Sequence, residues 1–125
     1  MKAIEIIEQS LSEAKQKGLR ITCGGCLFDW TGDNYSLKGC NCLGAVMLKF
    51  GLEHLAGPSG GFAEDWLIQL SAVLGEPPFW MARFLLGFDI GTQVVRITIN
   101  KEGKEINREE DEVSRMGLKL RKKFV

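Results

Sequence analysis

The four cysteines are the residues of this chain whose type and spacing best suit metal chemistry. Cys23 and Cys26 are separated by two residues, and Cys40 and Cys42 by one. A two-residue gap is typical of the zinc knuckles in which thiolates hold a structural Zn²⁺. The segment 27–39 is long enough to fold back and bring the two pairs together. The spacing therefore predicts a four-thiolate zinc site with these cysteines as ligands.

Two other interpretations of the cysteines stay open. Cys42 opens a segment that we expect to be a buried helix, where a free cysteine behaves as a small hydrophobic residue. The cysteines would then be buried thiols without a metal. A redox pair of Cys23 and Cys26 would need a helix starting at the motif to lower a thiol pKa. Residues 27–30 look like a strand instead, so the redox interpretation is not favoured.

Other catalytic arrangements find little support in the sequence. Residues 57–61 match the G-x-S-x-G pattern of a nucleophile elbow, but the segment before them is helical in character rather than a strand. The only histidine, His54, lies upstream of that motif, whereas the corresponding triad order places it downstream. No carboxylate stands at a defined helical spacing from His54. The sequence thus favours a protein that is not an enzyme.

The segment Leu67–Gly87 resembles the spacing of a repressor-type helix-turn-helix, which would imply a DNA-binding regulator. A recognition helix must offer polar side chains to the edges of the bases. Here residues 78–81 are Pro-Phe-Trp-Met, and Arg83 is the one residue on this helix of a type that commonly contacts base edges. The formal net charge of the chain is +0, whereas nucleic-acid-binding domains usually have a basic excess. We therefore keep DNA binding as an alternative and do not expect a nucleic-acid partner.

Length and composition indicate one globular domain, residues 1–125. The chain has 125 residues, of which 45% are hydrophobic and 26% are charged, so it can bury a core without disulfides. The longest apolar stretch, residues 79–88, is interrupted by Arg83 and falls short of the roughly 20 residues of a membrane-spanning helix. Glu5 and Glu8 lie where a signal peptide would be apolar. We expect a cytoplasmic protein with reduced cysteines and no membrane partner.

Hydrophobic periodicity predicts about five helices and one or two small β-hairpins, an α+β fold that is predominantly helical. Residues 20–38 look extended around a turn at 31–34, and residues 94–100 look like a strand that ends in a turn at 101–104. The expected helices span residues 3–17, 41–50, 62–74 and 77–86, with a further turn at 52–56 and a last helix that Asn107 would cap.

The predicted helix at 77–86 is apolar on most sides, so we expect it either at the centre of the core or on a contact surface for a partner. Aromatic side chains exposed on this helix would support the second role. The residues expected to be largely buried are Val46, Phe50, Trp66, Leu70, Leu74, Trp80, Met81, Phe84, Leu85 and Leu120.

Two short segments resemble small uncharacterised bacterial and phage helical proteins. These proteins have a Cys-x-Leu-Gly-Ala helix start, which residues 39–46 (Gly-Cys-Asn-Cys-Leu-Gly-Ala-Val) resemble, and a later Trp-rich helix, which residues 80–89 resemble. The resemblance implies that Cys42 is a helix-start residue and that the source is bacterial or phage. Cys40 and the Cys23/Cys26 pair lie outside the shared pattern. No function can be transferred from these proteins.

The sequence as a whole favours a small non-enzymatic accessory or protein-interaction domain, acting through its surface on a protein partner or as a homo-oligomer. Net neutrality gives little repulsion between copies, which is compatible with self-association. Two alternatives stay open: a zinc-stabilised module with Cys23, Cys26, Cys40 and Cys42 as ligands, and a helix-turn-helix-like regulator.

Overall fold

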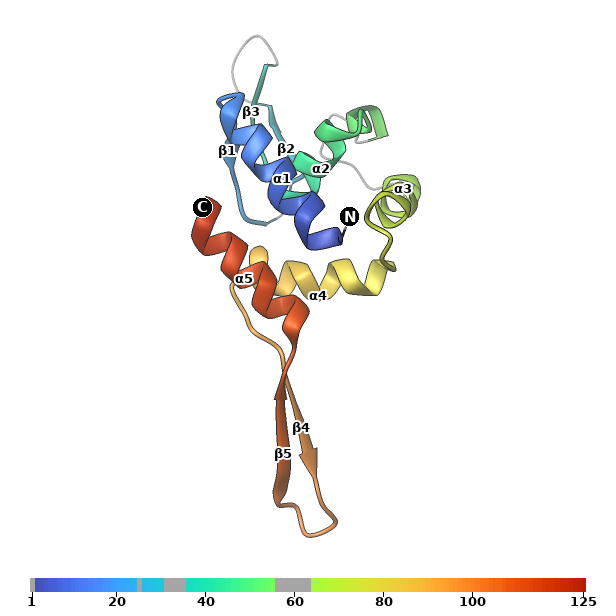
Figure 1. Ribbon diagram of the computed structural model, residues 1–125, viewed down its shortest axis with the longest axis vertical. Helices are drawn as coiled ribbons and strands as arrows, with labels where there is room; N and C mark the ends of the chain where they lie inside the picture. The colour runs from blue at the N-terminus through green and yellow to red at the C-terminus, as the bar shows by residue number, and fades with distance from the viewer. Residues whose placement is uncertain (1, 25, 31–35, 56–63) are drawn as a thin grey trace.

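The computed structural model of the chain describes residues 2–24, 26–30, 36–55 and 64–125. Within these residues it has five α-helices and two small β-sheets, which confirms the predicted α+β, predominantly helical fold (Figure 1). The elements in chain order are α1 (Ala3–Gln16), β1 (Arg20–Ile21), β2 (Phe28–Trp30), β3 (Leu37–Cys40), α2 (Cys42–Lys49), the 3-10 turn η1 (Glu53–Leu55), α3 (Glu64–Leu74), α4 (Pro78–Phe88), β4 (Val95–Ile99), β5 (Glu105–Glu110) and α5 (Glu112–Phe124).

The N-terminal part of the fold packs α1 and α2 together beside a three-stranded sheet of order β1-β3-β2. The expected hairpin in residues 20–38 is present as the antiparallel pair β2–β3, and β1 adds a short parallel strand. The expected turn at 31–34 lies outside the described residues. Asn41 caps α2, as predicted, because its side-chain oxygen accepts a hydrogen bond of 2.8 Å from the Gly44 amide.

The helices α4 and α5 approach each other closely because each has a glycine at the contact. A Cβ atom on Gly87 would overlap the Ser114 carbonyl, and one on Gly117 would overlap the Phe84 carbonyl. At the far end of this contact the Arg121 guanidinium donates to the carbonyls of Phe88 and Asp89, at 2.8 and 2.9 Å. Those carbonyls terminate α4, so a cation there satisfies groups that the helix itself leaves free.

An aromatic row stacks along α4 and places this helix in the core. The ring centroids of Trp80 and Phe84 lie 5.5 Å apart, and those of Phe84 and Phe88 lie 6.0 Å apart. Phe84 and Phe88 are fully buried, whereas Phe79, on another side of α4, is 70% exposed. The expectation of a largely buried helix is therefore right for one side of α4, and another side faces solvent.

The β4–β5 hairpin projects away from the helices as a single arm (Figure 1). This hairpin shows that the prediction of Asn107 as the cap of the last helix was wrong. Residues 105–110 form β5, in which Asn107 pairs with Thr98, and the helix begins only at Glu112. Asp111 is the cap, because its carboxylate accepts a hydrogen bond of 2.9 Å from the Ser114 amide. Pairing with β4 holds residues 107–110 in a strand, where the sequence predicted the start of the helix.

The expected core is confirmed for Val46, Leu70, Leu74, Met81, Phe84 and Leu120, which are buried. Phe50 is a wrong prediction, because it is 43% exposed. It stands at the C-cap of α2, where the helix ends and the chain turns through Gly51 in the left-handed conformation. Trp66, Trp80 and Leu85 are only partly buried and pack against the edge of the core.

No helix among the described residues combines the length and the apolarity that crossing a membrane requires.

The close approach of α4 and α5 gives a testable consequence. We expect Gly87→Ala to lower the free energy of unfolding by about 2 kcal/mol or more, because the added Cβ overlaps backbone that cannot move aside cheaply. Alanine on its own would stabilise a helix by about 1 kcal/mol relative to glycine. Urea unfolding followed by circular dichroism measures the difference. Arg115→Ala, at an exposed site on α5, is the control and should stay within about 0.5 kcal/mol of the parent. A Gly87→Ala protein as stable as the control would contradict the packing.

Candidate interaction site

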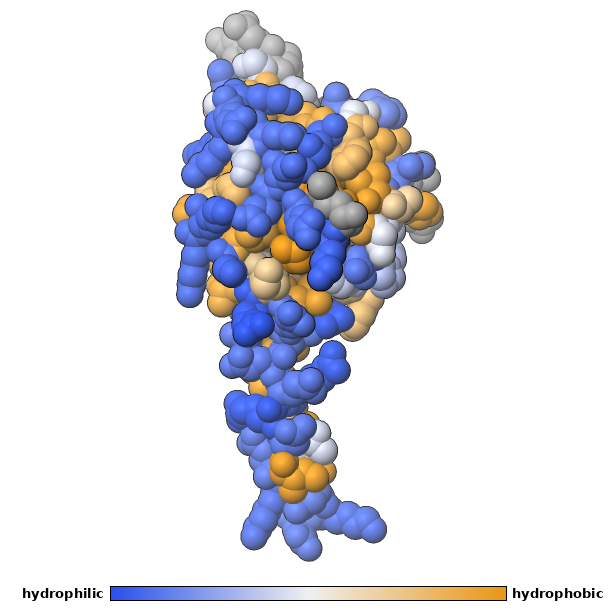
Figure 2. Space-filling model, in the orientation of Figure 1, coloured by the Kyte–Doolittle hydropathy of each residue, from blue (hydrophilic) through white to orange (hydrophobic). Residues whose placement is uncertain are grey.

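The arm formed by β4 and β5 exposes a group of large apolar side chains. Ile97, Ile99 and Ile106 are 47%, 60% and 62% exposed. In the space-filling view the arm is mostly hydrophilic, with an apolar patch toward its tip (Figure 2). A single exposed isoleucine is ordinary on a protein surface, but three grouped on one projecting element form a surface suited to contact with another molecule.

The two faces of the arm differ in polarity because side chains alternate along a strand. Val95, Ile97 and Ile99 share one face of β4. The opposite face presents Arg96 and Thr98, whose partners across the hairpin are Glu109 and Asn107. The register shifts between Thr98 and Ile99, which leaves Ile106 as an extra residue in β5. On the face of Val95, Ile97 and Ile99, the residues opposite them in β5 are the charged Glu110, Arg108 and Glu105. The apolar side chains therefore form a row along β4, in which Ile97 and Ile99 are exposed to solvent.

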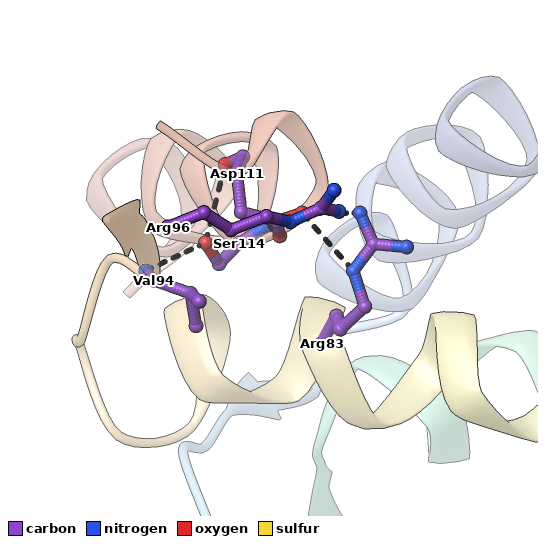
Figure 3. A network of polar contacts seen from close by, with 5 residues as sticks. All are labelled: Arg83, Val94, Arg96, Asp111 and Ser114. Carbon is purple, nitrogen blue, oxygen red and sulfur yellow. Dashed lines mark hydrogen bonds and ion pairs between the residues drawn. The ribbon is translucent and has the colours of Figure 1, made fainter. Parts of the chain in front are cut away.

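The root of the arm is fixed to the helices by Asp111, the residue between β5 and α5. Its side chain is 1% exposed and forms an ion pair with Arg83 of α4, which includes a 3.0 Å hydrogen bond from Arg83 Nε. Arg96 of β4 lies 3.8 Å from the same carboxylate oxygen. The close view shows both guanidinium groups reaching toward Asp111 from different elements (Figure 3). One carboxylate therefore joins the arm, α4 and the start of α5.

Ser114 completes the attachment through the backbone. Its hydroxyl accepts a hydrogen bond of 2.9 Å from the Val94 amide and donates one of 3.2 Å to the Asp111 carbonyl. The Asp111 amide in turn donates to the Val94 carbonyl at 2.8 Å. Val94 directly precedes the hairpin and Asp111 directly follows it, so these bonds set the direction in which the arm leaves the helices.

The surroundings of Asp111 lower its pKa. Burial of the carboxyl group acts to raise the pKa, but the hydrogen bonds and charge of Arg83, together with the amide and hydroxyl of Ser114, lower it by more. Asp111 is therefore ionised in the folded protein at neutral pH, and its charge is matched by a neighbouring cation rather than left unpaired.

A second apolar surface lies where α1, α4 and α5 begin. An open groove of about 370 Å³ is lined there by Ile4, Trp80, Val113 and Met116, with charged residues at its margin. Phe79 is exposed beside this region of α4, and the Arg83 guanidinium lies 5.8 Å from the centre of its ring. The exposed aromatic side chain expected of a contact surface on this helix is thus present.

The four predicted metal ligands occupy different environments. Cys40 and Cys42 are fully buried, Cys23 is half-buried and Cys26 is exposed. Across residues 2–24, 26–30, 36–55 and 64–125, no three His, Cys, Asp or Glu side chains are grouped as metal ligands would be. Zinc binding by the four cysteines stays a prediction. Elemental analysis decides it: one zinc per chain would support the site, and no zinc with four free thiols would exclude it.

Burial makes three of the thiols poor nucleophiles. It raises the pKa of Cys40 to about 11 and also raises that of Cys42 well above its usual value, with the Asp89 carboxylate adding to the effect on Cys42. Burial also raises the pKa of Cys23, and the nearby Arg121 offsets only part of the change. Because the thiolate is the reactive form, the raised pKa values favour the protonated, less reactive form of these side chains at neutral pH. The arrangement gives no support to redox chemistry at Cys23.

The other sequence motifs do not meet at a site. His54 is exposed on η1, and the G-x-S-x-G segment lies outside the described residues. Arg83, the base-reading residue of the helix-turn-helix alternative, is bound to Asp111. The sequence predicted the first strand of the arm and its turn, but it missed Asp111, Ser114 and the second strand. The alternation of Val95, Ile97 and Ile99 before a Gly103 turn was a signal for a hairpin with an apolar row along its first strand.

Comparison with known proteins gives no match: neither a protein-family model, nor a curated protein, nor a solved structure is similar to this chain. The resemblance to small bacterial and phage proteins therefore stays a prediction.

The lowered pKa of Asp111 predicts a pH-dependent contribution to stability. A carboxyl group whose folded-state pKa is depressed stabilises the fold above its unfolded value of about 3.9, and the contribution is lost as the pH falls through the folded-state pKa. We expect Asp111→Asn, which keeps a good N-cap residue, to lower the free energy of unfolding by about 2 kcal/mol at pH 7. The deficit should shrink below pH ~3.9.

Urea unfolding at a series of pH values measures this deficit. Glu112→Gln removes a neighbouring exposed carboxylate and is the matched control, which should lower the free energy of unfolding at pH 7 by no more than about 1 kcal/mol. A deficit of constant size from neutral to acid pH would show that the charge of Asp111 does not stabilise the fold.

Proposed function

We propose that this chain is a small protein-interaction domain and that the β4–β5 arm is its main contact element. The observation behind the proposal is a group of solvent-exposed isoleucines on a hairpin that projects from the helices, with Ile97, Ile99 and Ile106 each about half exposed or more. An isolated two-stranded sheet is at best marginally stable in water. Contact with a protein would bury the isoleucines and add to the sheet.

The charges of the arm favour a protein as the partner. Nucleic-acid-binding β-ribbons and arms are rich in basic residues, which neutralise phosphates. Here the basic residues are matched in number by acidic ones, so the arm has no net positive charge. The basic residues are Arg96, Lys101, Lys104 and Arg108, and the acidic ones are Glu102, Glu105, Glu109 and Glu110.

The attachment of the arm also supports a recognition role. Protein contacts with a preorganised surface lose less conformational entropy than contacts with a mobile one. The ion pair between Asp111 and Arg83 and the bonds of Ser114 hold the root of the arm against α4 and α5. The exposed isoleucines are thereby presented in one direction.

Site-specific photo-crosslinking tests the proposal. A photoreactive amino acid replaces Ile99 on the arm and, as the control, Lys15, which is exposed on α1. After irradiation in cells of the natural source, we expect protein adducts from position 99 in clear excess over position 15, identified by mass spectrometry. Equal adducts from both positions, or adducts from position 99 that contain only nucleic acid, would contradict a protein-binding arm.

A further inference from the structure

We propose that β4 pairs with β4 of a second copy of this chain, antiparallel across a twofold axis at Ile97, so that two arms form one continuous sheet. The inference rests on the proposed function and names the partner of the arm. It is argued from the direction of the backbone groups, the register they permit and the charges on the two edges of the hairpin.

The hydrogen bonds of the hairpin show which backbone groups of β4 are free. The Val94 carbonyl accepts from Asp111, and the Asn100 amide donates to Lys104 at 2.9 Å, so both residues direct these groups toward β5. Backbone groups alternate in direction along a strand. The N–H and C=O groups of Val95, Ile97 and Ile99 therefore point away from β5, toward the open edge of the arm.

A twofold axis at Ile97 matches these free groups with their own copies. In an antiparallel pair about that axis, Ile97 lies opposite Ile97 of the partner subunit, and Val95 lies opposite the partner's Ile99. All of these residues direct their backbone groups outward, so each pair can exchange both of its hydrogen bonds. No other donor or acceptor on this edge has to move for the ladder to form.

The same register also matches the side chains. Residues directly opposite each other in a sheet share a face. The pairing places Val95, Ile97 and Ile99 of both copies together on one face of the joined sheet. On the other face, Arg96 lies opposite the partner's Thr98, so no like charges meet. Cross-strand pairs of β-branched residues are among those that stabilise a sheet.

The outer edge of β5 is a poorer site for such pairing. Its sequence from Glu105 to Glu110 contains four charged residues. Twofold pairing about Arg108, whose backbone groups point to that edge, would put Arg108 opposite the partner's Arg108, and like charges directly opposite are destabilising. Charged edges are a common protection against unwanted strand pairing. The β4 edge, with Arg96 as its one charged residue, lacks that protection.

The shape of the molecule leaves room for the paired arms. The arm extends away from the helices, so antiparallel arms put the two helical parts at opposite ends of the joined sheet (Figure 1). Each arm contributes two strands, and two arms give a sheet of four. An isolated hairpin is at best marginally stable in water, and joining two arms gives a wider sheet in which the apolar rows of the two β4 strands lie side by side.

Proline substitution tests the pairing because it removes one N–H without adding charge. In Ile97→Pro the lost N–H points outward, so the hairpin itself keeps its bonds. Arg108→Pro is the matched control: Asn107 and Glu109 lie opposite the inward-facing Thr98 and Arg96, so the Arg108 amide points to the other open edge. Sedimentation equilibrium over a range of concentrations measures the dimer dissociation constant of the purified full chain.

We expect the parent chain and Arg108→Pro to dimerise and Ile97→Pro to weaken the dimer about tenfold or more. A parent chain that is monomeric at all concentrations, or dimers that survive Ile97→Pro, would overturn the inference. In either case crosslinks from position 99 to a different protein would leave the proposed function standing. The absence of any protein crosslink from the arm would overturn both the proposed function and the pairing between copies.

Discussion

The ion pair between Asp111 and Arg83 is the interaction on which the arrangement of this molecule depends. Asp111 follows β5, caps α5 and binds a guanidinium from α4. Its side chain is almost fully buried, so the cost of desolvating a carboxylate is offset only if charge and hydrogen bonds are both satisfied. Arg83, the Ser114 amide and the nearby Arg96 provide these partners. This carboxylate, together with the bonds among Ser114, Val94 and the Asp111 backbone, sets the direction of the arm.

The position of Asp111 depends in turn on the close packing of α4 against α5. The helices α4 and α5 approach closely enough for Arg83 to reach Asp111 because Gly87 and Gly117 leave no side chain between them. The stacked rings of Trp80, Phe84 and Phe88 fill the adjacent core. The packing of α4 against α5 and the ion pair between Asp111 and Arg83 together hold the hairpin, with its exposed isoleucines, in a defined place. Exposed apolar side chains of this kind mark interaction sites, and on a protein without a partner they would promote aggregation.

Much of this fold follows from the sequence, because periodicity and helix-end signals report local structure directly. The boundaries of α1, α2, α3 and α4 were expected to within a few residues, and the Asn41 cap was foreseen. The last helix was placed too early, since Asn107 is as good a cap as Asp111 by type. Which of the two caps the helix depends on strand pairing between β4 and β5, a contact between segments that no local pattern determines.

The candidate site was harder to anticipate for the same reason. Cysteine spacing suggests metal binding whenever two pairs can meet, yet burial of Cys40 and Cys42 depends on how α2 packs against its neighbours. Arg83 looked like a lone polar residue on an apolar helix, and its partner lies 28 positions away in the chain. The exposure of Ile97 and Ile99 is likewise a property of where the arm points, since the same alternation in sequence is typical of a half-buried strand.

Backbone ¹⁵N relaxation is the measurement that tests most directly whether Asp111 fixes the arm. It is made in the Ile97→Pro background, so that pairing between copies does not contribute, with and without Asp111→Asn. With Asp111 present, the amides of β4 and β5 should show the order parameters of the helices, about 0.85. In the Asp111→Asn protein they should fall while the chemical shifts of the hairpin persist. An arm that already moves independently with Asp111 in place, or one that Asp111→Asn leaves unchanged, would contradict the account.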